Sequence, residues 1–384
     1  MRRLVERLSE QRIAAGVPDW LVPIALISVI GLLIQSTRLH HANFSVFLFD
    51  YEHGFIRRGL LGSIANLAPD ALDPYYIYVT IYGATAVALY VLFILLFYRS
   101  LKWDEREAVL PNVLFCLVIL VSPIFLKNAY HDFGRVDQLG YLCLLIFAVA
   151  TPRAQRWLVV LMPPVLILCH EGQVILTLPP ILAMFLIAAL RSESLLRLRT
   201  IAPVLASIAL SLSLTFYFLL HGVPEVDHET LSRYFESKSP HNTGERSWLL
   251  YDSVAANFEI AMGRDRKWRQ LANSPLYVLT LIIHLPVIGL IYRIYRHGRG
   301  LALRLACGLV VATAIAQSVI FFLSIDYARH ISNIFVCHVV LLLFLIRSFG
   351  LGALLTEQAV RYQIFLIALA LIFYPIPRYG IISP

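Results

Sequence analysis

The sequence has few charged residues and few polar stretches between its apolar runs. Charged side chains make up 15% of the 384 residues, hydrophobic residues make up 59%, and runs near 20 apolar residues recur along the chain. A helix of about 20 apolar residues crosses the roughly 30 Å hydrocarbon core of a bilayer. The composition therefore excludes a soluble globular domain and indicates a polytopic membrane protein.

Cysteine is scarce as well, and the metal-binding spacings are missing. The five cysteines all fall inside apolar segments, and no two of them form a CxxC pair. This excludes a disulfide framework and a CxxC metal site. Neither an HExxH nor a DxD spacing occurs, so no pattern predicts a metal centre, although His and carboxylate side chains elsewhere keep a divalent cation as an alternative.

The net charge of +8 does not indicate nucleic-acid binding, because the basic residues lie mostly in short loops between spans. With the N-terminus in the cytoplasm, 18 of the 32 basic residues fall on the inner side, seven in the loop 222–274 and seven in short outer segments. This asymmetry follows the positive-inside rule. Residues 1–16 carry arginines and no small-residue cleavage signature follows them, so we expect a retained anchor.

We therefore predict an all-α fold, a polytopic transmembrane helical bundle of about 11 spans that forms one integral membrane domain over residues 1–384. Residues 157–190 are too long for one span and short for two; we predict two short spans that turn at His170-Glu171-Gly172. The expected spans are 21–37, 74–98, 109–126, 136–151, 157–169, 173–190, 201–220, 275–294, 301–324, 334–347 and 362–374.

Ionisable residues cluster at span ends on the expected outer face, and such clustering is typical of a functional site. In the first outer loop, 38–73, Asp50, Glu52 and His53 precede Arg57 and Arg58. An acid here is suited to act as a general base toward a sugar hydroxyl, and arginine to grip a phosphate. We expect residues 55–64 to form a short interfacial helix. The alternative is a helix anchored by snorkelling arginines, with Asp50 as a cap or salt-bridge partner.

Two further sets share the pattern Asp-aromatic-small-Arg at outer span ends. The first is Asp132 to Arg135, with His131 before it and Asp137 after it; the second is Asp326 to Arg329, followed by His330. We predict two similar Asp/Arg constellations that face one cavity. Ordinary helix capping by the acids is the alternative.

The pair His170-Glu171 lies between apolar runs, where an unpaired charged carboxylate is costly. One interpretation is structural, with Glu171 tying the helical hairpin to Arg135 or Arg329. The other is acid/base or metal chemistry. The long outer loop 221–274 contains Trp248 and Tyr251, which are suited to stack on a sugar ring or to lie buried, and a basic run at 264–269 suited to lipid phosphate.

These features resemble the GT-C superfamily of polyprenyl-phosphate-dependent glycosyltransferases. The likeness lies in an inner N-terminus, a large first outer loop with an acidic pair and a short helix, and Asp/Arg/His sets at outer span ends. The chain departs from the better-known members because it shows no large C-terminal soluble domain and no diagnostic family signature. A related resemblance is to Wzy-like polymerases or ligases of envelope polysaccharide, which use outer arginines on undecaprenyl pyrophosphate.

The resemblance implies an enzyme that moves a sugar or glycan from a polyprenyl-linked donor to a glycan or lipid-linked acceptor on the periplasmic face of a bacterial inner membrane. It implies no certain cofactor. A transporter or flippase of lipid-linked glycan and a non-catalytic assembly subunit are the rival classes. The implied catalytic residues are Asp50, Glu52, Asp132, His170 and Glu171, the lipid phosphate-binding residues are Arg57, Arg58, Arg135 and Arg329, and the supporting residues are His53, Asp137, Asp326 and His330.

Overall fold

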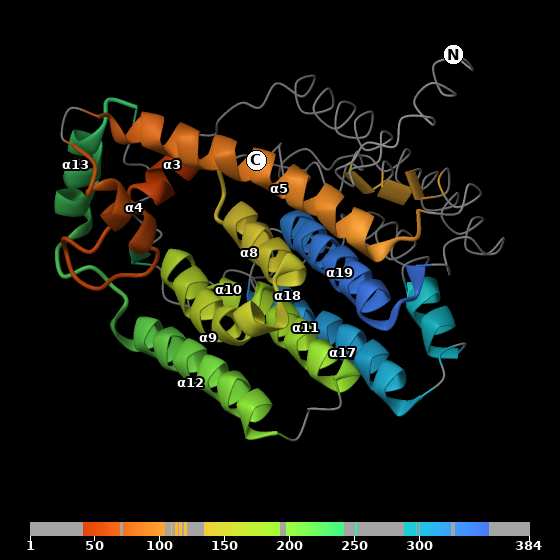
Figure 1. Ribbon diagram of the computed structural model, residues 1–384. Coiled ribbons are helices and arrows are strands. Elements are labelled where there is room, and N and C mark those ends of the chain that lie inside the picture. The colour runs from red at the N-terminus through yellow and green to blue at the C-terminus, as the bar shows by residue number, and fades with distance from the viewer. Residues whose placement is uncertain are drawn as a thin grey trace, which may run out of the picture.

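The computed structural model describes a bundle of helices (Figure 1). No strand occurs among the residues described, which are 41–69, 72–103, 134–192, 197–241, 250–251, 288–296, 298, 300–323 and 327–352, with 109, 112, 113, 115, 116, 119 and 120. Five helical stretches within them are long and apolar enough to cross a membrane: Pro74–Ser100, Gln173–Arg191, Thr200–His221, Leu301–Ser318 and Arg329–Phe349. Each coincides with an expected span. The expected spans 21–37 and 362–374, and most of 109–126 and 275–294, lie outside the described residues.

The long helices begin where the sequence offers a cap. Helix α5 (Pro74–Ser100) starts after Asp73, whose carboxylate accepts the Tyr75 N–H at 2.8 Å, and its first residue is a proline. Helix α9 (Pro152–Cys169) starts in the same way after Thr151. Proline suits the first helical turn, because its missing N–H would have no helical partner there. The remaining long helices are α8 (Asp137–Val149), α11 (Leu178–Arg191), α12 (Leu198–His221), α17 (Leu301–Ser318) and α19 (Tyr327–Phe349).

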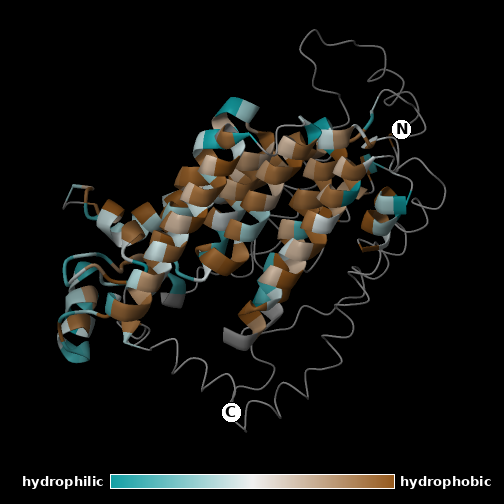
Figure 2. Ribbon diagram, turned by 90° about the horizontal axis from the view of Figure 1, so that it is seen from below, coloured by the Kyte–Doolittle hydropathy of each residue, from teal (hydrophilic) through white to brown (hydrophobic). Residues whose placement is uncertain are grey.

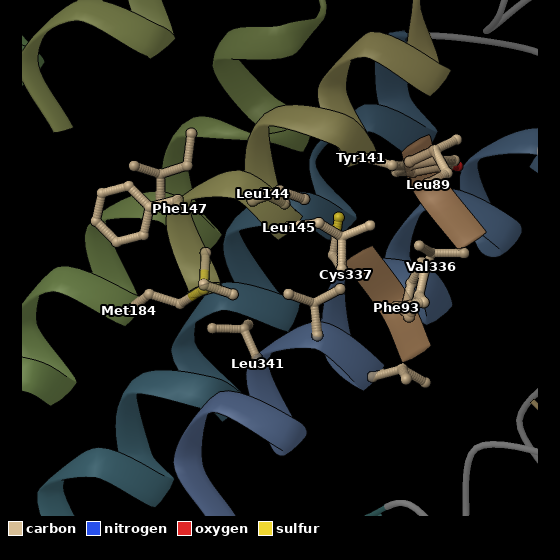
Figure 3. Packing of buried hydrophobic residues seen from close by; sticks show 14 of the residues in the cluster. Leu89, Phe93, Tyr141, Leu144, Leu145, Phe147, Met184, Val336, Cys337 and Leu341 are labelled. Atoms are coloured by element: carbon tan, nitrogen blue, oxygen red, sulfur yellow. The ribbon is translucent and has the colours of Figure 1, made fainter. Parts of the chain in front are cut away.

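Helix α19 occupies the centre of the bundle and α12 lies at its edge. In the most apolar part of each helix, 89% of the α19 residues are buried but only 17% of the α12 residues. Around α19 the core is filled by side chains from α5, α8 and α11, including Phe93, Leu145 and Met184 (Figure 3). Figure 2 shows the hydrophobic colour along most of the length of these helices and the hydrophilic colour mainly toward their ends and in α13 (His228–Lys238). Helix α12 therefore presents apolar side chains outward, as a lipid-facing helix does.

The predicted break in the segment 157–190 is confirmed. Helix α9 ends at Cys169, and the chain resumes helical structure at α10 (Gln173–Leu176) and α11. Pro179 and Pro180 lack an N–H, so the helical bonds to the carbonyls of residues 175 and 176 cannot form. The Leu176 carbonyl is satisfied instead from another helix: Gln317 Nε2 of α17 donates to it at 2.6 Å. A side chain from a distant helix thus completes the backbone bonding at a break inside the bundle.

We expect Gln317→Leu to lower the stability of the bundle by about 1–3 kcal/mol, because it leaves a buried carbonyl without its amide donor. The measurement is thermal unfolding in detergent. The matched control is Ser318→Ala, since the Ser318 hydroxyl bonds only the Ala314 carbonyl of its own helix among printed partners and is exposed. Equal melting temperatures for the two variants would contradict this role of Gln317.

The expected interfacial helix at 55–64 is wrong in its first half. Helix α4 spans Leu60–Ala65, so Arg57 and Arg58 lie in a turn before it. The reason is the backbone of Arg58, whose φ of +64° cannot continue a right-handed helix. The preceding apolar run forms α3 (His41–Phe47). Helices α3, α4 and α13 gather at one end of α5 (Figure 1).

Arginine and glutamine side chains cap α8 at its C-terminus, which lies at the opposite end of the bundle. Arg347 Nη1 donates to the Ala148 carbonyl at 2.7 Å and Arg99 Nη1 to the Val149 carbonyl at 3.1 Å, while Gln155 Nε2 donates to Phe147 at 3.0 Å. Cations at a helix C-terminus are favourable because they face the negative end of the helix dipole. This end was expected to be cytoplasmic.

Candidate functional site

A salt bridge between Arg58 and Glu171 joins the first outer loop to the turn after α9. Arg58 Nε donates to Glu171 Oε2 at 3.0 Å, and Arg58 Nη2 donates to Glu171 Oε1 at 2.5 Å. The side chains keep only 15% and 19% of their exposure. Such a two-bond arginine–carboxylate pair fixes the direction of the guanidinium group as well as its position. We expected Arg135 or Arg329 as the partner of Glu171; Arg58 holds it instead.

The backbone places Arg58 in this position at a cost. A φ of +64° is left-handed and is unfavourable for an arginine by roughly 1 kcal/mol. The next residue, Gly59, lies so close to Tyr51 that a Cβ there would be 2.3 Å from the ring. A strained residue next to an obligatory glycine persists only where its surroundings hold it, and such strain is frequent at functional sites.

Arg57 lies beside this pair and is almost fully buried. Its Nη1 is 4.0 Å from Glu171 Oε1, and its Nη2 donates to the Leu250 carbonyl at 2.9 Å. Its backbone N–H donates to the carbonyl of Gly222, the residue after α12, at 3.4 Å. Two adjacent guanidinium groups are therefore oriented by one carboxylate and one carbonyl group from distant parts of the chain.

A second ion pair joins the first residue of α8 to α19. Arg329 Nε is 3.3 Å from Asp137 Oδ2, and both side chains are largely buried. Asp137 also interacts electrostatically with Arg135, His170 and His330. Arg135 lies in the turn before α8, after Gly134, whose φ of +87° and close contact with the Tyr78 hydroxyl exclude any larger residue.

His170 connects the two ion pairs, since it interacts electrostatically with both Arg58–Glu171 and Arg329–Asp137. Burial and the Arg58 charge lower the pKa of His170 to about 4, so the imidazole is neutral at neutral pH. Its Nδ1 accepts the Gly172 N–H at 3.0 Å, which assigns the ring proton to Nε2. Burial alone would raise the pKa of Glu171, but the adjacent Arg58 holds it well below the ordinary value, so Glu171 is ionised.

Asp50 forms a separate cluster that attaches α13 to the first outer loop. Its carboxylate is 1% exposed and accepts hydrogen bonds from Asn66 Nδ2 at 2.7 Å, from the Tyr234 hydroxyl at 2.9 Å and from Lys238. The Glu52 N–H donates to it at 3.1 Å. Burial would raise the pKa of Asp50, but the bond and charge of Lys238, with Asn66 and Glu52, outweigh it and lower that pKa.

This shift predicts a pH dependence of stability. A carboxyl whose folded pKa is lowered stabilises the fold above its unfolded pKa of about 3.9, and the contribution is lost as the pH falls through the folded pKa. We expect the melting temperature of the wild type to fall more steeply than that of Asp50→Asn between about pH 5 and pH 2, because the variant lacks this titration. Parallel curves would contradict the assignment. Glu171 titrates in both proteins, so its effect cancels.

Glu52 and His53 lie next to Asp50 in a different environment. Glu52 is exposed, and His53 contacts the Tyr234 ring edge-on at 4.5 Å between ring centroids. Burial, followed by the nearby Asp50 charge, raises the pKa of Tyr234, so its hydroxyl keeps the proton that it donates to Asp50. Of the two first-loop acids, Asp50 is bound on both oxygens and Glu52 is accessible.

The structure thus brings most of the predicted residues to one end of the bundle. Two ion pairs, linked by His170, assemble residues from four separate segments of the chain. Asp132 and Asp326 lie outside the described residues, as do Trp248 and the run 264–269. Tyr251 donates its hydroxyl to the Val226 carbonyl at 2.6 Å and so anchors the long outer loop. The network contains Arg57, Arg58, Arg135, Asp137, His170, Glu171, Arg329 and His330.

Lys238, Tyr234 and Asn66 are the residues that sequence reasoning missed. Lys238 and Tyr234 are one helical turn apart on α13, a spacing that places them on one helix face. That spacing, in a loop with few lysines, was the available signal; the partner, Asp50, lies 188 residues away in the chain and could not be read from it. Among the described residues, no three or more His, Cys, Asp or Glu side chains group to hold a metal ion.

The comparison with protein families gives one match. The family model described as uncharacterised membrane protein Rv1490 matches residues 18–238, which is more than half of the chain. The chain belongs to this family. The matched range contains the first outer loop, the Arg58–Glu171 pair, Asp137 and α13, whereas Arg329 lies beyond it. No curated protein and no solved structure matches the chain.

Membership in a membrane-protein family and the five apolar helical stretches together identify the chain as a membrane protein.

Proposed function

We propose that the protein is a glycosyltransferase that moves a sugar or glycan from a polyprenyl phosphate carrier to an acceptor hydroxyl. The reaction is placed at the outer face of a bacterial inner membrane, in envelope polysaccharide or glycoconjugate assembly. The observation that carries the proposal is the Arg57–Arg58 pair: two buried, preoriented guanidinium groups at a bundle end, one of them held in a strained conformation.

The arginines suit a departing phosphate. In the proposed step, the acceptor oxygen attacks the anomeric carbon, and the bond between that carbon and the phosphate oxygen breaks. The electron pair of this bond leaves with the polyprenyl phosphate. Arg58 is oriented by Glu171 and Arg57 by the Leu250 carbonyl. Donors that are already aligned stabilise developing negative charge without reorganisation, which is a major source of catalysis.

The base that removes the acceptor proton is assigned to Glu52. Asp50 and Glu52 were equal candidates from the sequence, but a carboxylate that is buried and bonded to Lys238, Tyr234 and Asn66 is a poor proton acceptor. Glu52 is exposed and two residues away. His170 is neutral with its proton on Nε2, so its role is to donate a hydrogen bond near the phosphate.

The orientation rests on the distribution of arginine. Arg99 and Arg347 lie at the bundle end opposite to the ion-pair network, together with the short basic loops that the positive-inside rule places in the cytoplasm. This supports an outer location of the network.

The test uses purified full-length protein in lipid nanodiscs, a radiolabelled polyprenyl phosphate-linked sugar and a panel of acceptor glycans. Formation of a labelled product by chromatography and mass spectrometry supports the transferase. Movement of the labelled lipid between leaflets without bond exchange would assign a flippase instead. Neither transfer nor movement, with lipid binding absent, would leave the assembly-subunit class and end the proposal.

A further inference from the structure

The lipid-facing surface of α12 carries a groove near its outer end. The groove has a volume of about 520 Å³, within the range of small-molecule sites. Its described lining follows one face of α12 over the last three turns: Leu212, Ser213, Phe216, Tyr217, Leu220 and His221. A plain lipid-facing helix needs an apolar surface, but it does not need a hollow one.

The groove leads directly to the arginine pair. Phe55 of the first outer loop packs against the Tyr217 and Phe218 rings, each with centroids 5.4 Å from its own. Two residues later, the Arg57 backbone bonds the Gly222 carbonyl, and a Cβ on Gly222 would lie 2.8 Å from Arg57 Cγ. The apolar groove and the guanidinium groups are therefore continuous, with only Phe55 and Ile56 between them in the chain.

This sequence of surfaces, apolar in the bilayer and cationic at its outer edge, matches a lipid with one hydrocarbon chain and a phosphate head. We infer that the groove holds the first isoprene units of the polyprenyl phosphate carrier, with its phosphate at Arg57 and Arg58. The inference rests on the proposed function and assigns the part of the donor that transfer chemistry alone does not specify. Aromatic and aliphatic side chains contact the chain, and arginine contacts the charge.

Bulk phospholipid is the rival occupant, and a groove-filling variant separates the two. Ser213→Trp places a large ring in the groove. Leu219→Trp adds the same ring to an exposed position at the same end of α12 that does not line the groove, so it is the matched control. We expect Ser213→Trp to weaken polyprenyl phosphate binding at least about tenfold, equivalent to roughly 1.4 kcal/mol, and Leu219→Trp to leave it unchanged.

The experiment is photocrosslinking in nanodiscs with a polyprenyl phosphate that carries a diazirine in its first isoprene units. Labelling of residues 212–221 that is competed by unlabelled polyprenyl phosphate, is not competed by phosphatidylglycerol, and is lost only in Ser213→Trp supports the inference. Equal competition by phosphatidylglycerol, or labelling on another helix, overturns it.

The readout does not depend on transfer. Labelling in the groove by a protein that transfers no sugar would retain the lipid site and remove the glycosyltransferase. Transfer by a protein that is labelled elsewhere would do the reverse.

Discussion

Replacing Arg58 with alanine is expected to abolish sugar transfer and to lower the free energy of unfolding by about 3 kcal/mol. Removing one member of a largely buried ion pair leaves the other charge uncompensated, at a cost of about 3–5 kcal/mol in fully buried cases. The residual exposure of Glu171, 19% of its side chain, places the expected loss at the lower limit. Transfer is measured with the labelled donor, and stability by thermal and denaturant unfolding in detergent.

Two further variants separate the charge of Arg58 from its backbone strain and from folding. The double variant Arg58→Ala/Glu171→Gln removes the orphaned charge, so it should recover most of the stability while transfer stays absent. Arg58→Gly should be about 1 kcal/mol more stable than Arg58→Ala, because glycine adopts the φ of +64° without strain. Transfer at the wild-type rate in any of these variants would remove the arginine from the mechanism.

Glu52→Gln is expected to lower the transfer rate by about 10²–10⁴-fold, the usual contribution of a general base, without changing stability. The side chain is exposed, so its substitution should alter the free energy of unfolding by less than about 0.5 kcal/mol. Asp50→Asn should show the opposite pattern. It leaves Lys238 without its carboxylate and should cost about 1–3 kcal/mol of stability, with transfer retained in the protein that remains folded.

The comparison of these two acids decides which of them is the base. Initial rates at saturating donor, normalised to folded protein by size-exclusion chromatography, are the appropriate readout. Loss of transfer in Asp50→Asn with full activity in Glu52→Gln would reverse the assignment. Equal losses in both, with stability unchanged in both, would show that the two acids act together.

The sequence predicted the helices well where periodicity and caps agree. Asp73-Pro74 and Thr151-Pro152 begin α5 and α9, and the break at His170-Glu171-Gly172 lies where the prolines and the length of the segment placed it. It also predicted that ionisable residues of the expected outer span ends would meet. The interfacial helix at 55–64 failed at Arg58, because the side chains of Glu171 and Tyr51 hold a backbone conformation that local propensity opposes.

By itself the sequence determined the membrane class, the positions of the described spans and the end of the bundle where charge collects. These follow from the length of apolar runs and from the cost of placing charge in hydrocarbon, which act locally along the chain. Only the tertiary structure decided the partners: Arg58 with Glu171, Arg329 with Asp137, and Asp50 with Lys238. Those pairs join residues 113 to 192 positions apart, and the packing of whole helices, which no local pattern encodes, selects them.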